Sequence, residues 1–257
     1  MGAVVTVIIP AYNAAKYLAE AVESVLRQSE KRFELWIVDD NSIDNTVEIA
    51  EQYTYDGRVR VYKNNRNMGL AKLLNHYHAM VETPFTARMD SDDVMFENRL
   101  EMQLKVFDLF PFIDVLGSKV VPFAISYSCP KNLLVREPLA RVKTIAHPTL
   151  LARSIWLKSN LYSESLRRNE DAELWIRCST QYNIYQLNQP LLYYREIPSE
   201  YARKYKSGLL DAVAIWKRHK NARATFFLVK YILATFIYQI FDEFNSVNVL
   251  LNLRQRR

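Results

Sequence analysis

The sequence predicts an α/β protein: an open, mostly parallel sheet with helices on both faces, followed by a helical C-terminal segment. Two observations lead to this prediction. Short β-branched apolar runs alternate with segments of helical period in the first part of the chain. The first run, Val4–Ile9, is nearly continuous, as expected of a parallel strand buried on both faces. Beyond Tyr201 the pattern is helical, which accounts for the C-terminal segment.

The elements of the first part follow one another in the order of β-α-β units. We expect four strands, at 4–9, 33–38, 59–62 and 84–89, with three helices between them. The first helix should run from 14 to about 28, the second should end at 51, and the third should end at about 80. Asn13 is the expected N-cap of the first helix, and Asp44 or Asn45 that of the second. Gly69 precedes the third helix.

The pattern is less regular after the fourth strand. We expect a helix, a short strand, a second helix and an edge strand, at 97–109, 115–117, 171–178 and 191–195, whereas 122–144 fits no single pattern. We therefore divide the chain into a domain of residues 1–200, with halves of about 1–95 and 96–200, and a helical segment, 201–257.

Composition excludes several kinds of protein. The chain has 257 residues, 49% of them hydrophobic, which predicts a folded globular protein. Its five glycines are too far apart for the glycine-rich loops that bind dinucleotides or nucleoside triphosphates. Two cysteines, Cys129 and Cys178, are too few for a disulfide framework or a Cys-rich zinc site, and reduced thiols predict a cytoplasmic protein. The N-terminus resembles a first strand rather than a signal peptide.

The net charge of +6 is concentrated near the C-terminus. From Arg195 to Arg257 there are twelve Lys and Arg and five Asp and Glu, which gives +7 and leaves −1 for residues 1–194. This distribution predicts one basic segment that faces an anionic surface, and no nucleic-acid partner.

Polar clusters follow three of the expected parallel strands, at 10–13, 39–42 and 90–93. Ligands of open α/β sheets bind at the carboxyl ends of the strands, where these clusters should meet. So many carboxylates repel a bare diphosphate but suit Mg²⁺ or Mn²⁺ bridging carboxylate and diphosphate. For 39–42 the alternative is an ordinary turn. For 90–93 it is the cap of a following helix, which Asp93 would provide.

These clusters belong to a longer series of motifs. In order, the series is VIIPAYN at 7–13, IVDDNS at 37–42, NMGL at 67–70, MDSDD at 89–93, HPT at 147–149, EDAELWIR at 170–177 and LLYYR at 191–195. Over about residues 4–196 the chain resembles the family 2 glycosyltransferases. The resemblance implies the GT-A fold, a catalytic domain at 1–200 with nucleotide-sugar and acceptor halves, and an inverting, non-processive, metal-dependent hexosyl- or N-acetylhexosaminyl-transferase.

The resemblance also implies roles for residues on the donor side. Pro10, Tyr12 and Asp40 would line the base and ribose pocket of a nucleotide-sugar, usually a UDP-sugar. Asn67 and Lys72 would contact the base or the diphosphate. Asp90 would meet the ribose or the sugar, and Asp92 would bind the metal, Mn²⁺ or Mg²⁺. Asn13 and Ser91 fall within the same motifs and join the nucleotide-sugar-binding set.

On the acceptor side, the resemblance implies that Asp171 is the general base, with Glu170 as the alternative. A metal-stabilised diphosphate and one carboxylate base suffice for a single displacement with inversion at the anomeric carbon. Taken alone, Glu170-Asp171 fits the charged first turn of a helix equally well. His147 and Trp175 are expected on the acceptor side, although a loop histidine and a core tryptophan explain them without function.

Two departures from the family refine the expectation. A Gln-x-x-Arg-Trp element, which marks processive members, is absent. Residues 75–77 read Asn-His-Tyr where many members have Asn-x-Gly. The expected role is sugar transfer to a glycan or lipid-linked acceptor in bacterial surface polysaccharide, lipopolysaccharide or glycolipid assembly. The alternatives are a nucleotidyltransferase, which normally needs a glycine-rich loop after the first strand, and a non-catalytic sugar- or membrane-surface-binding protein of the same fold.

The C-terminal segment combines apolar and basic residues. Residues 224–241 contain one charge, Lys230, and four basic residues precede them between Lys217 and Arg223. Such a helix suits docking of 217–241 on an anionic membrane, packing on the catalytic domain, or a homodimer, whereas Lys230 argues against a true span. We expect a cytoplasmic protein that associates peripherally with the inner face of the membrane.

Overall fold

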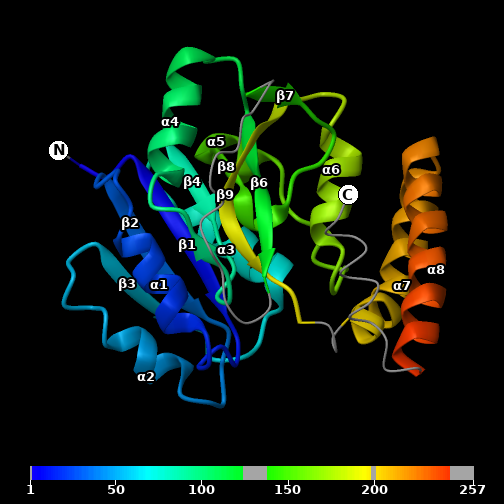
Figure 1. Ribbon diagram of the computed structural model, residues 1–257, viewed down its shortest axis with the longest axis horizontal. Helices are drawn as coiled ribbons and strands as arrows, with labels where there is room; N and C mark the ends of the chain where they lie inside the picture. The colour runs from blue at the N-terminus through cyan, green and yellow to red at the C-terminus, as the bar shows by residue number, and fades with distance from the viewer. Residues whose placement is uncertain (1, 124–137, 198–200, 244–257) are drawn as a thin grey trace.

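The computed structural model describes residues 2–123, 138–197 and 201–243, so Cys129, most of the stretch 122–144 and residues 244–257 of the C-terminal segment lie outside the described residues. Nine strands form one sheet in the order β3-β2-β1-β4-β8-β6-β9-β5, and β7 pairs with β9 outside that path (Figure 1). The strands are β1 (Val5–Ala11), β2 (Phe33–Asp39), β3 (Val59–Lys63), β4 (Phe85–Arg88), β5 (Val94–Met95), β6 (Val115–Phe123), β7 (Leu139–Arg141), β8 (Leu151–Arg153) and β9 (Ile184–Arg195).

Helices cover both faces of this sheet. They are α1 (Leu18–Leu26), α2 (Thr46–Glu51), α3 (Leu70–Met80), α4 (Arg99–Leu109), α5 (Ser154–Ser159), α6 (Glu170–Cys178), α7 (Tyr201–His219) and α8 (Ala222–Glu243), with a 3-10 turn, η1 (His147–Thr149). Strands β3, β2, β1 and β4 are parallel to one another. The predicted open sheet is therefore confirmed, and the carboxyl ends of β1, β2 and β4 meet at one edge.

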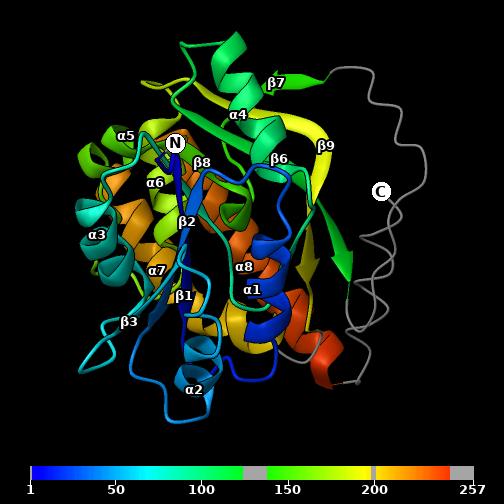
Figure 2. The same cartoon turned by 90° about the vertical axis from the view of Figure 1, so that its left-hand side faces the viewer.

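Two separate cores hold the layers together, because alternate residues of a strand point to opposite faces. Val5, Val7 and Ile9 of β1 pack with apolar side chains of α1 and α4. Ile8 and its neighbours on β2 pack with α3, α5 and α6 on the other face. Figure 2 shows α3 on one side of β1 and α1 on the other.

The second half of the sheet is mixed. Strand β8 is antiparallel to β4 and to β6, and β5 and β7 are both antiparallel to β9. Residues 191–195 form a strand as predicted, but the predicted edge position is wrong. They belong to β9, which runs from Ile184 to Arg195 and lies between β6 and β5. Its neighbours β5 and β7 have two and three residues, too short for a periodic signal in the sequence.

The first helix begins later than expected. Asn13 has φ 50, in the left-handed region, and does not cap a helix. Its backbone N–H donates to Ser42 Oγ (2.9 Å), and its side-chain oxygen accepts the N–H of Ile43 (3.0 Å). Asn13 thus joins the loops that follow β1 and β2, and α1 starts at Leu18.

The C-terminal helices α7 and α8 form a hairpin beside α6, at one end of the molecule (Figure 1). Asp211 of α7 accepts the backbone N–H groups of Arg167 and Arg168, at 2.9 and 2.8 Å, and so holds the segment that leads into α6. Gly208 lets α7 approach α8 closely, because a Cβ at this position would lie 2.1 Å from Tyr231 Oη of α8. One face of the hairpin is therefore packed on the domain.

Candidate active site

The loop after β2 is organised around Asp40, which is 4% exposed. Its carboxylate accepts the side-chain amide of Asn64 and the backbone N–H groups of Met68 and Gly69, each at 2.9 Å. Gly69 has φ 78, which glycine adopts without the strain that a Cβ would bring. Asp40 therefore fixes the entry to α3, where Asn67 and Lys72 lie.

The other donor-side residues named from the sequence are accessible at this edge of the sheet. Tyr12 is 52% exposed, Pro10 is half-buried, and Asn67 and Lys72 are exposed. Asn67 is held in place, because its side-chain oxygen accepts the N–H of Gly69 (3.1 Å). An exposed aromatic ring can stack on a base, and exposed amide and ammonium groups can bind an anionic diphosphate.

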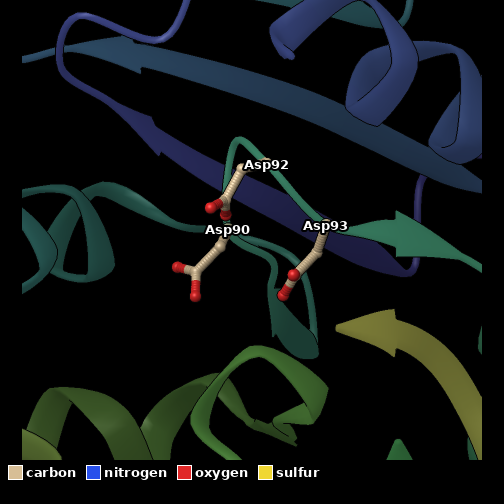
Figure 3. Close-up of side chains that lie close together, drawn as sticks. All are labelled: Asp90, Asp92 and Asp93. Carbon is tan, nitrogen blue, oxygen red and sulfur yellow. The ribbon is translucent and has the colours of Figure 1, made fainter. Parts of the chain in front are cut away.

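Three carboxylates converge in the turn between β4 and β5 (Figure 3). Ligand oxygens of Asp90, Asp92 and Asp93 all lie within 4.8 Å of one another. Arg195 holds this turn: its backbone N–H donates to Asp93 Oδ1 (2.9 Å) and its Nε to the carbonyl of Asp92 (2.8 Å). The alternative explanation of this turn, a helix cap provided by Asp93, is wrong, because β5 follows the turn and α4 begins only at Arg99.

The electrostatics of this turn fit a divalent cation. Burial and the charge of Asp90 raise the pKa of Asp92 to about 6. Burial and both neighbouring carboxylates raise the pKa of Asp93 well above its ordinary range. Asp93 Oδ2 is buried without a hydrogen-bond partner among the described residues. Mg²⁺ and Mn²⁺ bind hard oxygen ligands and would relieve the repulsion between these carboxylates. The residues present therefore fit such an ion.

A cavity of about 510 Å³ opens beside the turn, and we call it the catalytic cavity. Asp90, His147, Glu170 and Asp171 all line it, so four residues named from the sequence meet there. Trp175 lines a second, neighbouring cavity. The remaining residues named from the sequence line neither cavity: Pro10, Tyr12, Asn13, Asp40, Asn67, Lys72, Ser91 and Asp92.

Glu170 and Asp171 stand in the first turn of α6, after Asn169. Glu170 is 4% exposed, and burial together with the Asp171 charge raises its pKa to about 7. Asp171 retains accessible surface, and burial raises its pKa, although the charges of Arg88 and Lys204 act in the opposite direction. At least one of the two carboxyl groups is therefore easily protonated near neutral pH.

His147 is buried at the wall of the cavity. Burial and the nearby charge of Arg88 lower its pKa well below the ordinary range. Its Nε2 lies 2.8 Å from Tyr162 Oη, and its Nδ1 lies 4.0 Å from Glu170. Trp175 is 3% exposed, and its ring stands perpendicular to that of His147 at 6.4 Å. Of these rings, that of His147 lies against Glu170.

Comparison of the sequence with known proteins gives a family that agrees with this geometry. The family model described as "Glycosyl transferase family 2" matches residues 6–180. The chain belongs to this family. It is a glycosyltransferase, and the sheet and helices described above are its GT-A fold.

Relatives from several organisms are similar over most of the chain. A putative glycosyltransferase, EpsE, of Bacillus subtilis is 33% identical over 220 residues, covering 82% of this chain and 79% of that protein. A UDP-Glc:alpha-D-GlcNAc-diphosphoundecaprenol beta-1,3-glucosyltransferase, WfgD, of Escherichia coli is 28% identical over 72% of this chain and 73% of its own length.

Solved structures show the same fold. S. aureus TarS 1–349 in complex with UDP-GlcNAc has a TM-score of 0.67 and 25% identity, covering 92% of this chain and 73% of that one. A mannosyltransferase of Pyrobaculum calidifontis, in complex with GDP-Man and Mn²⁺, has a TM-score of 0.63 over 91% of this chain and 74% of that one. Its identity is 13%, so that likeness concerns the fold alone.

Several residues of this family 2 site were not named from the sequence. Arg88 is buried in the catalytic cavity, pairs with Asp90, and leaves Nε and Nη1 without partners among the described residues. Lys204, Tyr205 and Tyr231 bring α7 and α8 into the wall of the same cavity. Arg88 could have been found from the sequence, because it is a charged residue at the end of an apolar strand, just before the Asp90–Asp93 motif. Nothing in the local sequence marks Lys204, Tyr205 or Tyr231.

Proposed function

We propose that this family 2 glycosyltransferase moves a sugar from a UDP-sugar to a hydroxyl of a glycan or lipid-linked acceptor, with inversion at the anomeric carbon. The observation that carries the proposal is the meeting of Asp90, Glu170 and Asp171 on one cavity, beside the Asp92-Asp93 turn. The UDP-GlcNAc of TarS and the UDP-Glc of WfgD, as their descriptions name them, support a UDP-linked hexose or N-acetylhexosamine as the donor. The diphosphoundecaprenol-linked acceptor in the description of WfgD supports a lipid-linked acceptor, and we place the reaction in bacterial surface polysaccharide, lipopolysaccharide or glycolipid assembly.

The donor side divides into two regions in this proposal. Tyr12, Pro10 and the loop held by Asp40 take the base and ribose, and Asn67 with Lys72 faces the base or diphosphate. Asp92, with Asp90 and Asp93, would hold Mg²⁺ or Mn²⁺, which supplies positive charge for the leaving diphosphate when bound. Arg195 keeps the carboxylates of this turn in place through its contacts with Asp92 and Asp93.

Asp171 acts as the general base. Its carboxylate takes the proton of the acceptor hydroxyl while that oxygen bonds to the anomeric carbon. The bond from the anomeric carbon to the diphosphate oxygen breaks, and its electron pair leaves with UDP. Asp171 is preferred to Glu170 because it retains accessible surface, whereas Glu170 is 4% exposed and lies against His147.

Arg88 connects the two carboxylate groups. It pairs with Asp90, and its charge also acts on Glu170 and Asp171. A fixed cation between them favours an ionised base without a mobile counterion. We therefore place Arg88 as a positioning residue between the donor and acceptor sides.

A screen of donors tests this proposal. The purified protein is incubated with a panel of UDP-, GDP- and dTDP-sugars, with Mn²⁺ or with EDTA, and released nucleotide is measured. We expect slow hydrolysis of one or more UDP-sugars that depends on the metal. Release from a GDP- or dTDP-sugar in preference to every UDP-sugar would contradict the donor assignment.

The C-terminal hairpin favours a peripheral membrane position in this proposal. Helix α8 is long and apolar enough to cross a membrane, and only 22% of its most apolar window is buried, but Lys230 lies within that window. Its exposed apolar stripe comprises Phe226, Val229, Ile232, Leu233, Phe236, Ile237 and Ile240. Exposed Lys217, Arg218 and Lys220 stand at the turn before it and suit anionic headgroups. The protein would then lie on the cytoplasmic face of the membrane.

Vesicle flotation tests this position. Wild type should float with phosphatidylglycerol vesicles, and Leu233→Ser with Phe236→Ser should abolish flotation. Ile155→Ser, at a side chain 69% exposed on α5, is the matched control and should float normally. A dimer in solution that the two α8 changes dissociate, without flotation of wild type, would assign the stripe to a second copy of the chain instead.

A further inference from the structure

A second cavity, of about 560 Å³, adjoins the catalytic cavity and is also lined by Asp171. Both cavities are bordered by the same four residues: Ile145, Asp171, Ala172 and Phe227. A molecule that reaches from one cavity to the other therefore passes the proposed base. We call the second cavity the α6–α8 groove, because most of its lining comes from those two helices.

The lining of the α6–α8 groove is apolar with cations among it. Its apolar part includes Ile145, Trp175, Ile176, Phe226 and Phe227. Its cations are Lys143, Arg223 and Lys230, and Asp171 is its one carboxylate among the described residues. The groove thus matches a ligand with a long apolar portion and a compact negative charge.

The cations are arranged by the helix itself. Arg223, Phe226, Phe227 and Lys230 follow the spacing i, i+3, i+4, i+7, which places them along one face of α8. Arg223 is half-buried, and its Nη1 donates to Ser179 Oγ at the end of α6 (2.8 Å). This hydrogen bond holds one cation of the groove at the C-terminal end of α6, the helix whose first turn carries Asp171.

The groove also leads to the surface stripe of α8. Phe226 lines the groove and is 71% exposed, and it is the first residue of that stripe. A chain that leaves the groove over Phe226 continues along Val229 and Leu233, which the proposed function places against the membrane. The path from Asp171 to the membrane surface thus has cations among apolar residues in the groove and apolar residues along the stripe.

From this arrangement we infer that the α6–α8 groove binds the lipid diphosphate of a membrane-anchored acceptor, with the acceptor sugar in the catalytic cavity. A diphosphate between sugar and lipid carries two negative charges, which Lys143, Arg223 and Lys230 offset. The lipid chain then lies over Phe226 and Phe227 towards the stripe. The inference rests on the proposed function, because it requires a transferred sugar to arrive at Asp171.

A bulk phospholipid is the competing occupant of this groove. Its headgroup carries one phosphate and needs no contact with the catalytic cavity. The inferred ligand instead spans the wall shared by both cavities, and three cations exceed what a single phosphate requires. The two ligands therefore differ in the affinity that they should show.

Calorimetry with farnesyl diphosphate tests the inference on the full chain. EDTA is present, so that no divalent cation draws the probe to the carboxylate turn. We expect Arg223→Glu with Lys230→Glu to weaken binding at least about tenfold, since two cations become anions. The matched control is Lys158→Glu with Lys206→Glu, which makes the same charge change at exposed residues that line neither cavity and should stay within about twofold of wild type.

Three further probes separate the contributions. Farnesol, inorganic diphosphate and dihexanoyl phosphatidylglycerol should each bind at least about tenfold more weakly than farnesyl diphosphate. Farnesol lacks the diphosphate, inorganic diphosphate lacks the apolar chain, and the phospholipid has one phosphate and only short chains. Equal farnesyl diphosphate affinity in wild type and the groove variant, or tighter binding of phosphatidylglycerol, would overturn the inference. Release of UDP from a UDP-sugar by wild type is measured separately, so a failed groove and a failed proposed function give different results.

Discussion

Glu170→Gln should make the protein more stable at alkaline pH, because the wild-type residue pays a burial cost when it ionises. Its side chain is 4% exposed, and its pKa rises from the ordinary 4.5 to about 7 in the folded protein. Between these values the folded state binds more protons than the unfolded state, so the free energy of unfolding falls as pH rises through this window. The shift in the pKa of Glu170 lowers the free energy of unfolding by about 3 kcal/mol above pH 7 and does not change it below pH 4.5.

Glutamine keeps the shape of the side chain and cannot ionise. We therefore expect Glu170→Gln to raise the free energy of unfolding at pH 8 by up to about 3 kcal/mol, which is roughly 6–12 °C in Tm for a chain of this size. At pH 5 the gain should be small. Urea unfolding and thermal melts at both values provide the measurement.

Glu173→Gln is the matched control on the same helix. Glu173 is also buried, at 1% exposed, but it pairs with Arg177 (3.2 Å) and His219 (2.9 Å). Its replacement should lower stability, because two partners lose their carboxylate. A Glu170→Gln protein with no gain at pH 8, or with an equal gain at pH 5, would refute the reasoning.

Three other changes probe the donor side. Asp40→Ala removes the acceptor of three hydrogen bonds, so it should cost about 3 kcal/mol in urea unfolding and weaken UDP binding; unchanged values for both would contradict the role of this loop. Arg195→Lys keeps the charge but cannot make the same contacts with Asp92 and Glu20, so calorimetry should show about tenfold weaker Mn²⁺-dependent UDP binding with an unchanged circular dichroism spectrum; unaltered affinity would argue against this contact. EDTA should reduce UDP affinity at least about tenfold in wild type but little further in Asp92→Asn, and an equal loss in both would move the metal elsewhere.

The first half of the fold was predictable because its signals are local. The buried run of β1 and the Asp-Asp motif after β2 each carry their information within a few residues. The antiparallel strands β5 and β7 and the three-residue β8 were missed, since their pairing depends on partners far along the chain. Asn13 shows the same limit: it is a good cap by composition, but its contacts with Ser42 and Ile43 fix a left-handed backbone instead.

The site divides in a similar way. Residue type and spacing favour a metal-binding role for Asp90 and Asp92. Asp171 is named only through the resemblance to the family, because the charged first turn of a helix explains it equally well. Residue type does not reveal that Arg88 lies between these carboxylates, since its surroundings come from η1 and α6, far along the chain. Nor does it reveal the α6–α8 groove, which exists only once the C-terminal hairpin has packed beside α6.

The most direct test of the central claim compares Asp171→Asn with Glu170→Gln in two assays, UDP binding by calorimetry and UDP release from the UDP-sugar that wild type hydrolyses. With Asp171 as the base, Asp171→Asn should bind UDP within about twofold of wild type and lose at least about a hundredfold in kcat. Glu170→Gln should keep at least about a tenth of wild-type turnover. Wild-type turnover in Asp171→Asn would contradict the account, and a loss confined to Glu170→Gln would assign the base to Glu170.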